Sequence, residues 1–234
     1  MCEVERLAWL RLARSSGLGP VTIRDLVARC GSAAQALVAL PELAKRSGRV
    51  RPIRLCTQRE AETELTTLAK LGARLIALSE PDYPEALAAI EDAPPVIAVR
   101  GRAELLAAPK IALVGARNAS ANGRQIARSM AQGLAASGFV VVSGMARGID
   151  TAAHLGVLDG RRVPNGTNGG GANGGGTIAV VAGGIDVLYP PENRPLFDRL
   201  GSEGLVGAEA APATAPRARH FPRRNRIVSG LSRA

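Results

Sequence analysis

The chain has 234 residues, which is enough for one sizeable α/β core and a small second module. Hydrophobic residues make up 46% of the chain and exclude general disorder, whereas aromatic residues make up only 3%, so the core must depend on Ala, Leu, Val and Ile. The formal net charge is +10, and only Lys45, Lys70 and Lys110 among the basic residues are not arginine. Because arginine pairs with phosphates and stacks on flat rings, this balance favours a nucleic-acid partner, although a GC-rich genome also enriches arginine.

Nothing in the sequence points to a secreted or membrane protein. Cys2, Cys30 and Cys56 are odd in number and form no CxxC pair, so we expect free thiols rather than a disulfide framework or a zinc ribbon. Charged residues interrupt every apolar run of the opening segment MCEVERLAWLRLAR, and no stretch has the length of a membrane span. The sequence therefore predicts a soluble, cytoplasmic protein.

Residues 1–66 are expected to form a small helical module, either SAM-like or helix-hairpin-helix-like. Apolar residues with helical spacing open the chain, and Ser32 and Thr57 are placed to cap later helices. Gly31 is expected to end the second helix. The turn GLGPVT, residues 17–22, resembles that of a helix-hairpin-helix, which offers backbone N–H groups to DNA phosphate; an ordinary packing unit of two helices is the simpler alternative.

Short apolar strands alternate with helices from residue 67 to residue 234. We expect strands at 73–79, 94–101, 111–115, 139–143, 177–182 and 205–209, and helices at 123–137, 151–158 and 192–200. This alternation is typical of a parallel sheet with helices on both faces, so the sequence predicts an α/β domain. Within it, the segment PNGTNGGGANGGG, residues 164–176, is mostly Gly and Asn, and we expect a flexible loop, either natural or engineered, without a function of its own.

Arginines recur in the segments that follow the expected strands. In a parallel sheet these segments gather at one edge, where ligands bind. Here they are 115–123, 143–150, 182–190 and the tail after Glu209, and small residues in them allow a ligand to approach the backbone closely. Their arginines are Arg117, Arg147, Arg223, Arg224 and Arg226. Since the following helices direct their N-terminal ends to the same place, the sequence predicts a phosphate-binding edge.

Sites for catalysis or metal binding fit the sequence poorly. Arg117 occupies the place of the second glycine in the dinucleotide fingerprint, and Ser143 lacks the flanking residues of a nucleophile elbow. Asp150 is expected to cap the next helix and to pair with His154, four residues later. Because His154 and His220 are the only histidines, no histidine metal site is expected. We therefore predict a protein that is not an enzyme and has neither a cofactor nor a metal.

The closing run FPRRNRIVSGLS, residues 221–232, differs from a simple solvated tail. Apolar residues interleave with its arginines, so part of it should pack. Phe221 beside Arg223 and Arg224 offers a ring next to cations, the combination that binds exposed bases. The amide of Asn225 is suited to contacting a base edge or holding the loop.

Four segments together resemble the DNA-processing protein A family, which is also called Smf. They are VGARNASANG, SGMARGIDTAAH, TIAVVAGGIDVLYPPEN and FPRRNRIVSGLS, in this order, and YPEAL and DAPPVIAVRG precede them. The similarity runs from about Arg74 to the C-terminus and more loosely over the helical module. The resemblance implies an extended Rossmann-like domain over residues 67–234 that binds single-stranded DNA without cleaving it. It also implies protection of the strand, loading of a RecA-type recombinase onto it during natural transformation, and action as a homodimer.

The resemblance also carries a set of binding residues and some departures. By motif, the DNA-binding positions are Arg117, Ser143, Gly144, Arg147, Phe221, Arg223, Arg224, Asn225 and Arg226. The family's domain continues past SGLS, so we expect a C-terminally shortened chain, for which homodimerisation is left open. The loop 164–176 is longer than in the family, and the segment 209–216 lacks the glycine that the family has there.

An enzyme is the alternative reading. Nucleotide phosphoribohydrolases have a similar Rossmann-like domain and carry a PGGxGTxxE motif whose glutamate acts at the ribose. The nearest stretch here, AGGIDVLYP, has neither that threonine nor that glutamate. A dinucleotide-dependent oxidoreductase does not fit the first loop, because Arg117 stands there.

Overall fold

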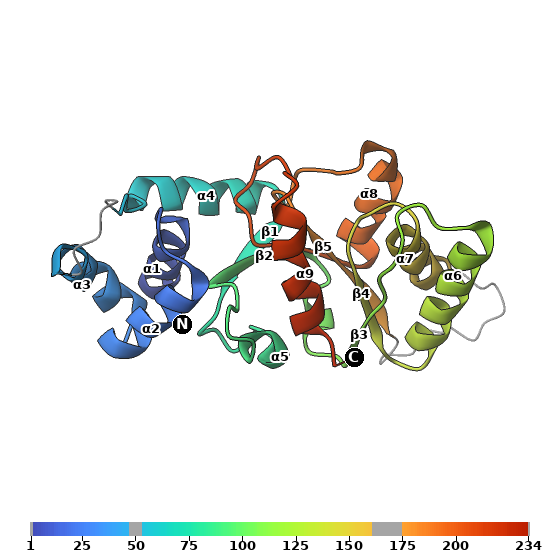
Figure 1. Ribbon diagram of the computed structural model, residues 1–234, viewed down its shortest axis with the longest axis horizontal. Helices are drawn as coiled ribbons and strands as arrows, with labels where there is room; N and C mark the ends of the chain where they lie inside the picture. Colours follow the sequence, from blue (N-terminus) through green and yellow to red (C-terminus); the bar gives the residue numbers. More distant parts are fainter. Residues whose placement is uncertain (1, 47–52, 161–174, 234) are drawn as a thin grey trace.

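The first part of the chain folds into helices, as its apolar spacing and capping residues predict. In the computed structural model, which describes residues 2–46, 53–160 and 175–233, these helices are α1 (Glu3–Arg14), α2 (Pro20–Cys30), α3 (Ala33–Arg46) and α4 (Gln58–Lys70). They lie together at one end of an elongated molecule (Figure 1). No helix among the described residues is long and apolar enough to cross a membrane.

Local caps explain where these helices begin and end. Gly31 has a left-handed conformation, with φ 85°, and closes α2, while Thr57 opens α4 with a capping box; both were predicted. The predicted cap at Ser32 also forms, since its Oγ accepts the N–H of Gln35 over 3.1 Å. Glu5 in α1 accepts the first N–H groups of α3 over 2.6 and 3.2 Å, which ties these two helices together.

The rest of the described chain forms a sheet with the strand order β1-β2-β6-β5-β4-β3. The strands are β1 (Ala73–Ala77), β2 (Val96–Gly101), β3 (Lys110–Ala112), β4 (Val140–Ser143), β5 (Gly176–Val181) and β6 (Leu205–Ala208). From β3 to β6 neighbouring strands are parallel, and the connections between them carry α6 (Ala121–Ala136), α7 (Ile149–Gly160), the short 3₁₀ helix η2 (Pro191–Asn193) and α8 (Arg194–Glu203). The predicted α/β class is confirmed.

The sheet is mixed rather than parallel throughout, which differs from the expectation. β1 pairs antiparallel with β2, and β2 pairs antiparallel with β6. Between β1 and β2 the chain carries only the short helix α5 (Glu85–Ala88), not the crossover helix that parallel neighbours usually need. After β2, the 3₁₀ helix η1 (Ala103–Leu106) leads to β3 at the far edge. An apolar run predicts a buried strand but carries no information about its direction.

Alternate residues along the strands pack on opposite faces of the sheet. On β5, Ala179 and Val181 face a core shared with α7, α8 and the N-terminal helices. Ile178 and Val180 face the other core, shared with α5, η1 and α9 (His220–Leu231). The sheet is therefore covered on both faces, as predicted.

The N-terminal helices and the sheet share one of these cores. Trp9 of α1 is buried in the same apolar cluster as Phe197 of α8 and Val206 of β6. Arg6 of α1 also forms a two-pronged ion pair with Glu80, with N–O distances of 2.7 and 3.0 Å. These contacts join the helical module firmly to the sheet.

The closing basic run forms a helix, which corrects the prediction of a fourth loop after Glu209. The chain is irregular only as far as Arg219, and α9 follows. Buried residues recur along α9 at helical spacing, namely Arg224, Ile227, Val228 and Leu231. The high arginine content obscured this apolar stripe in the sequence.

Part of the Gly/Asn-rich segment belongs to the sheet. Gly176 is the first residue of β5, and a Cβ there would lie 2.5 Å from Cδ2 of Leu105, so a larger residue would have to displace that side chain. Gly175 is likewise buried. Residues 164–174 of the expected flexible loop lie outside the described residues.

Candidate nucleic-acid interface

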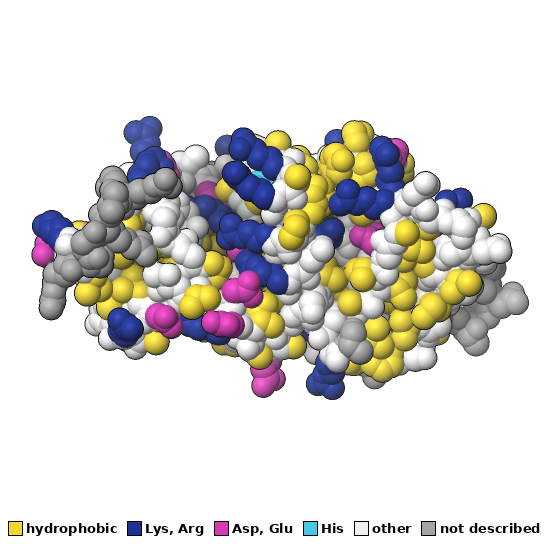
Figure 2. Space-filling model, viewed as in Figure 1, with side chains coloured by type: hydrophobic (Ala, Val, Ile, Leu, Met, Phe, Trp, Pro, Cys, Tyr) yellow, Lys and Arg dark blue, Asp and Glu magenta, His cyan; other side chains and the backbone are white. Residues whose placement is uncertain are grey.

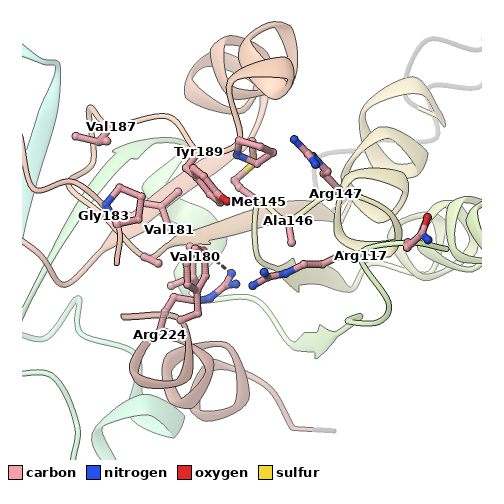
Figure 3. Close-up of a pocket in the computed structure, with 15 residues that line it drawn as sticks. Arg117, Met145, Ala146, Arg147, Val180, Val181, Gly183, Val187, Tyr189 and Arg224 are labelled. Atoms are coloured by element: carbon pink, nitrogen blue, oxygen red, sulfur yellow. Dashed lines mark hydrogen bonds between the residues drawn. The ribbon is translucent and has the colours of Figure 1, made fainter. Parts of the chain in front are cut away.

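The segments that follow β3, β4 and β5 and the segment that leads into α9 meet at one edge of the sheet, where they enclose a cleft of about 250 Å³ (Figure 3). This is the edge that the sequence predicts, because parallel strands bring their carboxyl ends together. None of the described residues that line the cleft is Asp or Glu. No group of three or more His, Cys, Asp or Glu in the described chain is placed to hold a metal ion. We call this hollow the stacking cleft; its charged, polar and aromatic lining is Arg117, Asn118, Arg147, Tyr189, Phe221 and Arg224.

Flat side chains form one wall of the stacking cleft. The guanidinium carbon of Arg117 lies 4.9 Å from the centroid of the Phe221 ring, a cation–π contact. The Phe221 ring in turn lies 5.7 Å from the ring of Tyr189, centroid to centroid, with an angle of 57° between the planes. Arg117 and Tyr189 are exposed, and Phe221 is half-buried. The wall therefore offers ring faces and a positive charge to a flat ligand.

Arg224 lies under the stacking cleft and is only 8% exposed. Its Nη1 donates to the carbonyl oxygen of Val180 over 2.8 Å, while its Nε has no partner among the described residues. Burial, and to a lesser degree the neighbouring Arg117, lowers the pKa of Arg224, whereas Asp150 opposes this shift. A buried cation with a free N–H, facing a second arginine, creates a strong preference for an anion.

The loop after β4 leaves room for Arg224. A Cβ at Gly144 would overlap the guanidinium group of Arg224, so any side chain there would displace Arg224 from this position. Ser143 is fully buried, and its Oγ donates to the carbonyl oxygen of Leu113 over 2.6 Å. Ser143 and Gly144, both predicted as binding positions, therefore support the floor of the cleft. The side chain of Ser143 does not reach the surface of the cleft.

His154 of α7 supports this loop from the interior. Its Nε2 lies 2.6 Å from the carbonyl oxygen of Gly144 and its Nδ1 lies 2.6 Å from Oγ1 of Thr177. A carbonyl can only accept, so Nε2 carries the proton. Burial lowers the pKa of His154 to about 4, which keeps the ring neutral at pH 7. The predicted pair of His154 with Asp150 is wrong, because both ring nitrogens of His154 have other partners. Asp150 is the second residue of α7 rather than its cap, and it accepts the N–H of Ala146 over 3.4 Å.

Arg147 stands at the rim of the stacking cleft. Its Nε donates to a carboxylate oxygen of Glu192, and this hydrogen bond raises the pKa of Arg147. Both side chains are exposed, so water screens their charges and the ion pair is weak. A phosphate group can therefore compete with Glu192 for Arg147.

The other predicted residues of α9 do not line the stacking cleft. Arg223 and Arg226 bind the same carboxylate oxygen of Glu209, with Nη2–Oε1 distances of 3.0 and 2.6 Å. Arg226 also donates to the carbonyl oxygen of Asp92. Asn225 is exposed and lines a different hollow beside α9. The structure thus brings Arg117, Arg147, Phe221 and Arg224 together and leaves these three outside.

Sequence reasoning missed several residues of this surface. Tyr189 completes the aromatic wall, and it was recognisable as one of two tyrosines in the chain, at the end of a loop already assigned to the edge. Arg217 and Arg219 are exposed just before α9. Figure 2 shows basic side chains gathered around that end of the helix.

Family models match both parts of the chain. The model described as DNA recombination-mediator protein A matches residues 74–234. The chain belongs to this family. A second model, the DprA-like N-terminal HHH domain, matches residues 3–67, which hold α1 to α3 and most of α4.

Individual members of the DNA recombination-mediator protein A family show the same relationship. The DNA processing protein DprA of Streptococcus pneumoniae is 43% identical over 151 residues, which are 64% of this chain and 49% of that protein. Protein Smf of Synechocystis is 33% identical over an alignment of 255 residues that covers 100% of this chain and 58% of that protein. The chain spans about half the length of the curated relatives that it matches.

Solved structures of the family resemble the fold described above. The crystal structure of DNA processing protein A from Streptococcus pneumoniae has a TM-score of 0.74 and 33% identity, and the match covers 99% of this chain and 76% of that one. A Helicobacter pylori structure, whose subject is the single-stranded DNA binding mode of DNA processing protein A, has a TM-score of 0.56 and 28% identity. That match covers 68% of this chain and 66% of the other.

Proposed function

We propose that this protein binds single-stranded DNA, with an unpaired base in the stacking cleft and the flanking phosphates on its arginines. The observation that carries the proposal is the row of Arg117, Phe221 and Tyr189 beside the buried cation of Arg224. Every base has a π face, so such a wall binds bases with little sequence preference. The Helicobacter pylori relative supports this proposal, because its structure concerns single-stranded DNA binding.

A single strand fits this site better than a duplex does. The stacking cleft has a volume of about 250 Å³ and is walled by side chains from four segments, so a base must leave its stack to enter it. In a duplex the base faces are covered by their neighbours, and exposing one costs a few kcal/mol. We therefore expect the protein to prefer single strands.

The predicted binding residues divide into two roles under this proposal. Arg117, Arg147, Phe221 and Arg224 contact the strand, and Arg223, Asn225 and Arg226 extend the contact along α9. Ser143 and Gly144 act through the backbone of the loop after β4, which they hold in place. No Asp or Glu lines the described part of the cleft, so nothing there supports the glycosidic chemistry of a nucleotide phosphoribohydrolase.

Fluorescence anisotropy with a labelled oligothymidylate and a matching duplex, measured across a salt series, tests the proposal. We expect tighter binding of the single strand, with log K falling by about 0.7 per phosphate contact for each log unit of salt. Phe221→Ala should weaken binding about 5- to 100-fold through lost stacking, and Arg117→Ala should in addition reduce the salt slope. Arg29→Ala removes an exposed arginine of α2 and serves as the control. Equal binding of the duplex, or release of a free base from a nucleoside monophosphate, would overturn the proposal.

We extend the proposal to the partners that the family's description suggests. A recombination mediator protects the single strand and passes it to a RecA-type recombinase, and it acts as a homodimer in this proposal. Strand-dependent ATP hydrolysis by the recombinase should start sooner when the protein is present, and nuclease digestion of the strand should slow. Light scattering with and without DNA measures the oligomeric state. A monomer in both conditions would contradict the homodimer.

A further inference from the structure

A second hollow of about 320 Å³ lies beside the stacking cleft, between α9 and the N-terminal helices. Arg14, Leu18 and Pro20 line it from α1 and the turn before α2. His220 and Arg223 line it from α9. We call it the interdomain hollow. It was not foreseen from the sequence, because its two walls are about two hundred residues apart.

The interdomain hollow adjoins the stacking cleft. Val181, Ala182 and Arg224 line both of them, so the two spaces share a wall at the end of β5. A ligand chain that leaves the cleft over Arg224 enters the hollow directly. Neighbouring units of one polymer can therefore occupy both spaces.

The charge of the interdomain hollow suits a phosphodiester. Arg14, Arg223 and Arg224 contribute cations, of which Arg14 is paired with Glu64 of α4 over 2.7 Å, and Glu209 is the only acidic residue among its described lining. That carboxylate is already bound by Arg223 and Arg226 over 3.0 and 2.6 Å, so its charge is neutralised. The excess charge is positive, and a negatively charged ligand is favoured.

The mouth of the interdomain hollow is also positive. Arg217, Arg219 and Arg223 lie close enough to His220 to lower its pKa, although burial is the larger cause. Arg217 and Arg219 are exposed and form no ion pair within the described part of the chain. Figure 2 shows this concentration of basic side chains at the end of α9.

The wall formed by the turn GLGPVT adds apolar surface and an open helix end. Leu18 and Pro20 are half-exposed, so they offer apolar contact to a base or sugar. Pro20 begins α2, and Gly19 before it makes no side-chain cap, which leaves the positive end of the helix dipole open towards the hollow. Apolar surface and positive charge together match a nucleotide rather than a simple ion.

We propose that the interdomain hollow is a second nucleotide subsite, which binds the nucleotide next to the one in the stacking cleft. The inference rests on the proposed function and deepens it, since it makes the N-terminal helices part of the DNA-binding surface. The strand then runs from the stacking cleft across Arg224, along the basic end of α9, to the turn before α2. A single strand of DNA is the occupant because the hollow continues the path of the first subsite.

Photo-crosslinking with 4-thiothymidine placed at successive positions of an oligothymidylate tests the path directly. Trypsin releases the turn as the peptide 15–24 and the Asn118 side of the stacking cleft as the peptide 118–124. We expect one position of the oligonucleotide to label peptide 118–124 and an adjacent position to label peptide 15–24. Labelling of 118–124 without any labelling of 15–24 would overturn the second subsite and leave the proposed function intact.

A charge variant at the turn provides an independent test. Pro20→Glu places a carboxylate in the hollow at the first position of α2, where acidic residues stabilise a helix, so the fold should be kept. We expect the affinity for a long oligothymidylate at low salt to fall about fivefold to tenfold. Pro20→Gln, which has the same size without the charge, should retain most of that affinity.

The length of the DNA separates the possible outcomes. Thymidine monophosphate, which can fill only the stacking cleft, should bind Pro20→Glu and the wild type equally. Equal binding of long oligonucleotides by Pro20→Glu and the wild type overturns the inference. If the wild type binds no single strand at all, the proposed function fails as well.

Discussion

At the scale of single residues, the site depends on one buried arginine and the residues that make room for it. Arg224 is 8% exposed and crosses directly over Gly144, where any side chain would collide with it. Its Nε has no partner among the described residues, and the nearby charge of Arg117 adds to the positive charge of the cleft. Under the proposed function, a phosphate of the DNA would offset that charge without a large rearrangement of the side chains.

His154 makes the stability of the fold dependent on pH. Its pKa is lowered to about 4 by burial, below the usual 6.5, so the unfolded chain takes up a proton between these values while the folded chain does not. Stability is therefore fully present above about pH 6.5 and is lost as the pH falls. We expect urea denaturation at pH 5 to give a free energy of unfolding roughly 2 kcal/mol lower than at pH 7.

Variants separate the contribution of His154 from that of other groups. Asp150 lies nearby, and burial raises its pKa, so its titration acts in the opposite direction. His154→Asn should be less stable at pH 7 but should lose much less between pH 7 and pH 5. His220→Asn, which changes the only other histidine, should keep most of the wild-type difference. An unchanged pH dependence in His154→Asn would contradict the assignment.

At the scale of elements, the segment before α9 is held in a conformation that its sequence does not favour. Ala213 has a φ of 59°, in the left-handed region, and it is the only non-glycine residue of the described chain with a positive φ. Its N–H donates to the carboxylate of Asp186 over 2.8 Å, and Gly184 donates to the carbonyl oxygen of Thr214 over 2.9 Å. These bonds dock the segment on the loop after β5 and hold Ala213 in a conformation that glycine adopts more easily.

Ala213→Gly should therefore stabilise the protein. The left-handed conformation costs alanine about 1–2 kcal/mol. The greater conformational freedom of glycine in the unfolded chain reduces the gain from its removal by about 0.5–1 kcal/mol. We expect a net gain of about 0.5–1 kcal/mol in the free energy of unfolding, measured in urea. Ala215→Gly, at an exposed position without a positive φ, is the matched control and should lose stability. The idea fails if both variants lose stability equally.

At the scale of the whole molecule, the helical module and the sheet behave as one unit. Their shared apolar cluster contains Trp9 of α1 and Phe197 of α8, and Arg14 links Glu64 of α4 to the carbonyl oxygen of Glu209. A domain that only touched its neighbour would not share a core with it. This rigid junction also keeps the walls of the interdomain hollow in register.

Because Trp9 is the only tryptophan, its fluorescence reports on α1 and on the core that α1 shares with the sheet. We expect the urea transition followed by Trp9 fluorescence to coincide with the transition followed by far-ultraviolet circular dichroism. An earlier Trp9 transition would show that the N-terminal helices unfold separately. That outcome would also weaken the inference that they form part of the binding surface.

Local patterns in the sequence determined the elements and the location of the site. Thr57 and Gly31 mark helix ends because capping is local chemistry, and the apolar runs predict the strands of the parallel part of the sheet. Parallel strands necessarily bring their carboxyl ends to one edge, so the motifs around Arg117 and Arg147 could be assigned to a common site.

Only the tertiary structure decided what each side chain does there. The direction of β1 and β2 depends on how the chain turns between them, and the helix α9 depends on an apolar stripe that gains its stability from the sheet. Three features of the site depend on contacts between residues that are distant in sequence. They are the burial of Arg224, its close approach to Gly144, and the ion pairs of Arg223 and Arg226 with Glu209. Charge and motif are properties of the sequence, whereas burial and pairing exist only once the chain has folded, and these set which arginines are exposed and which are already paired.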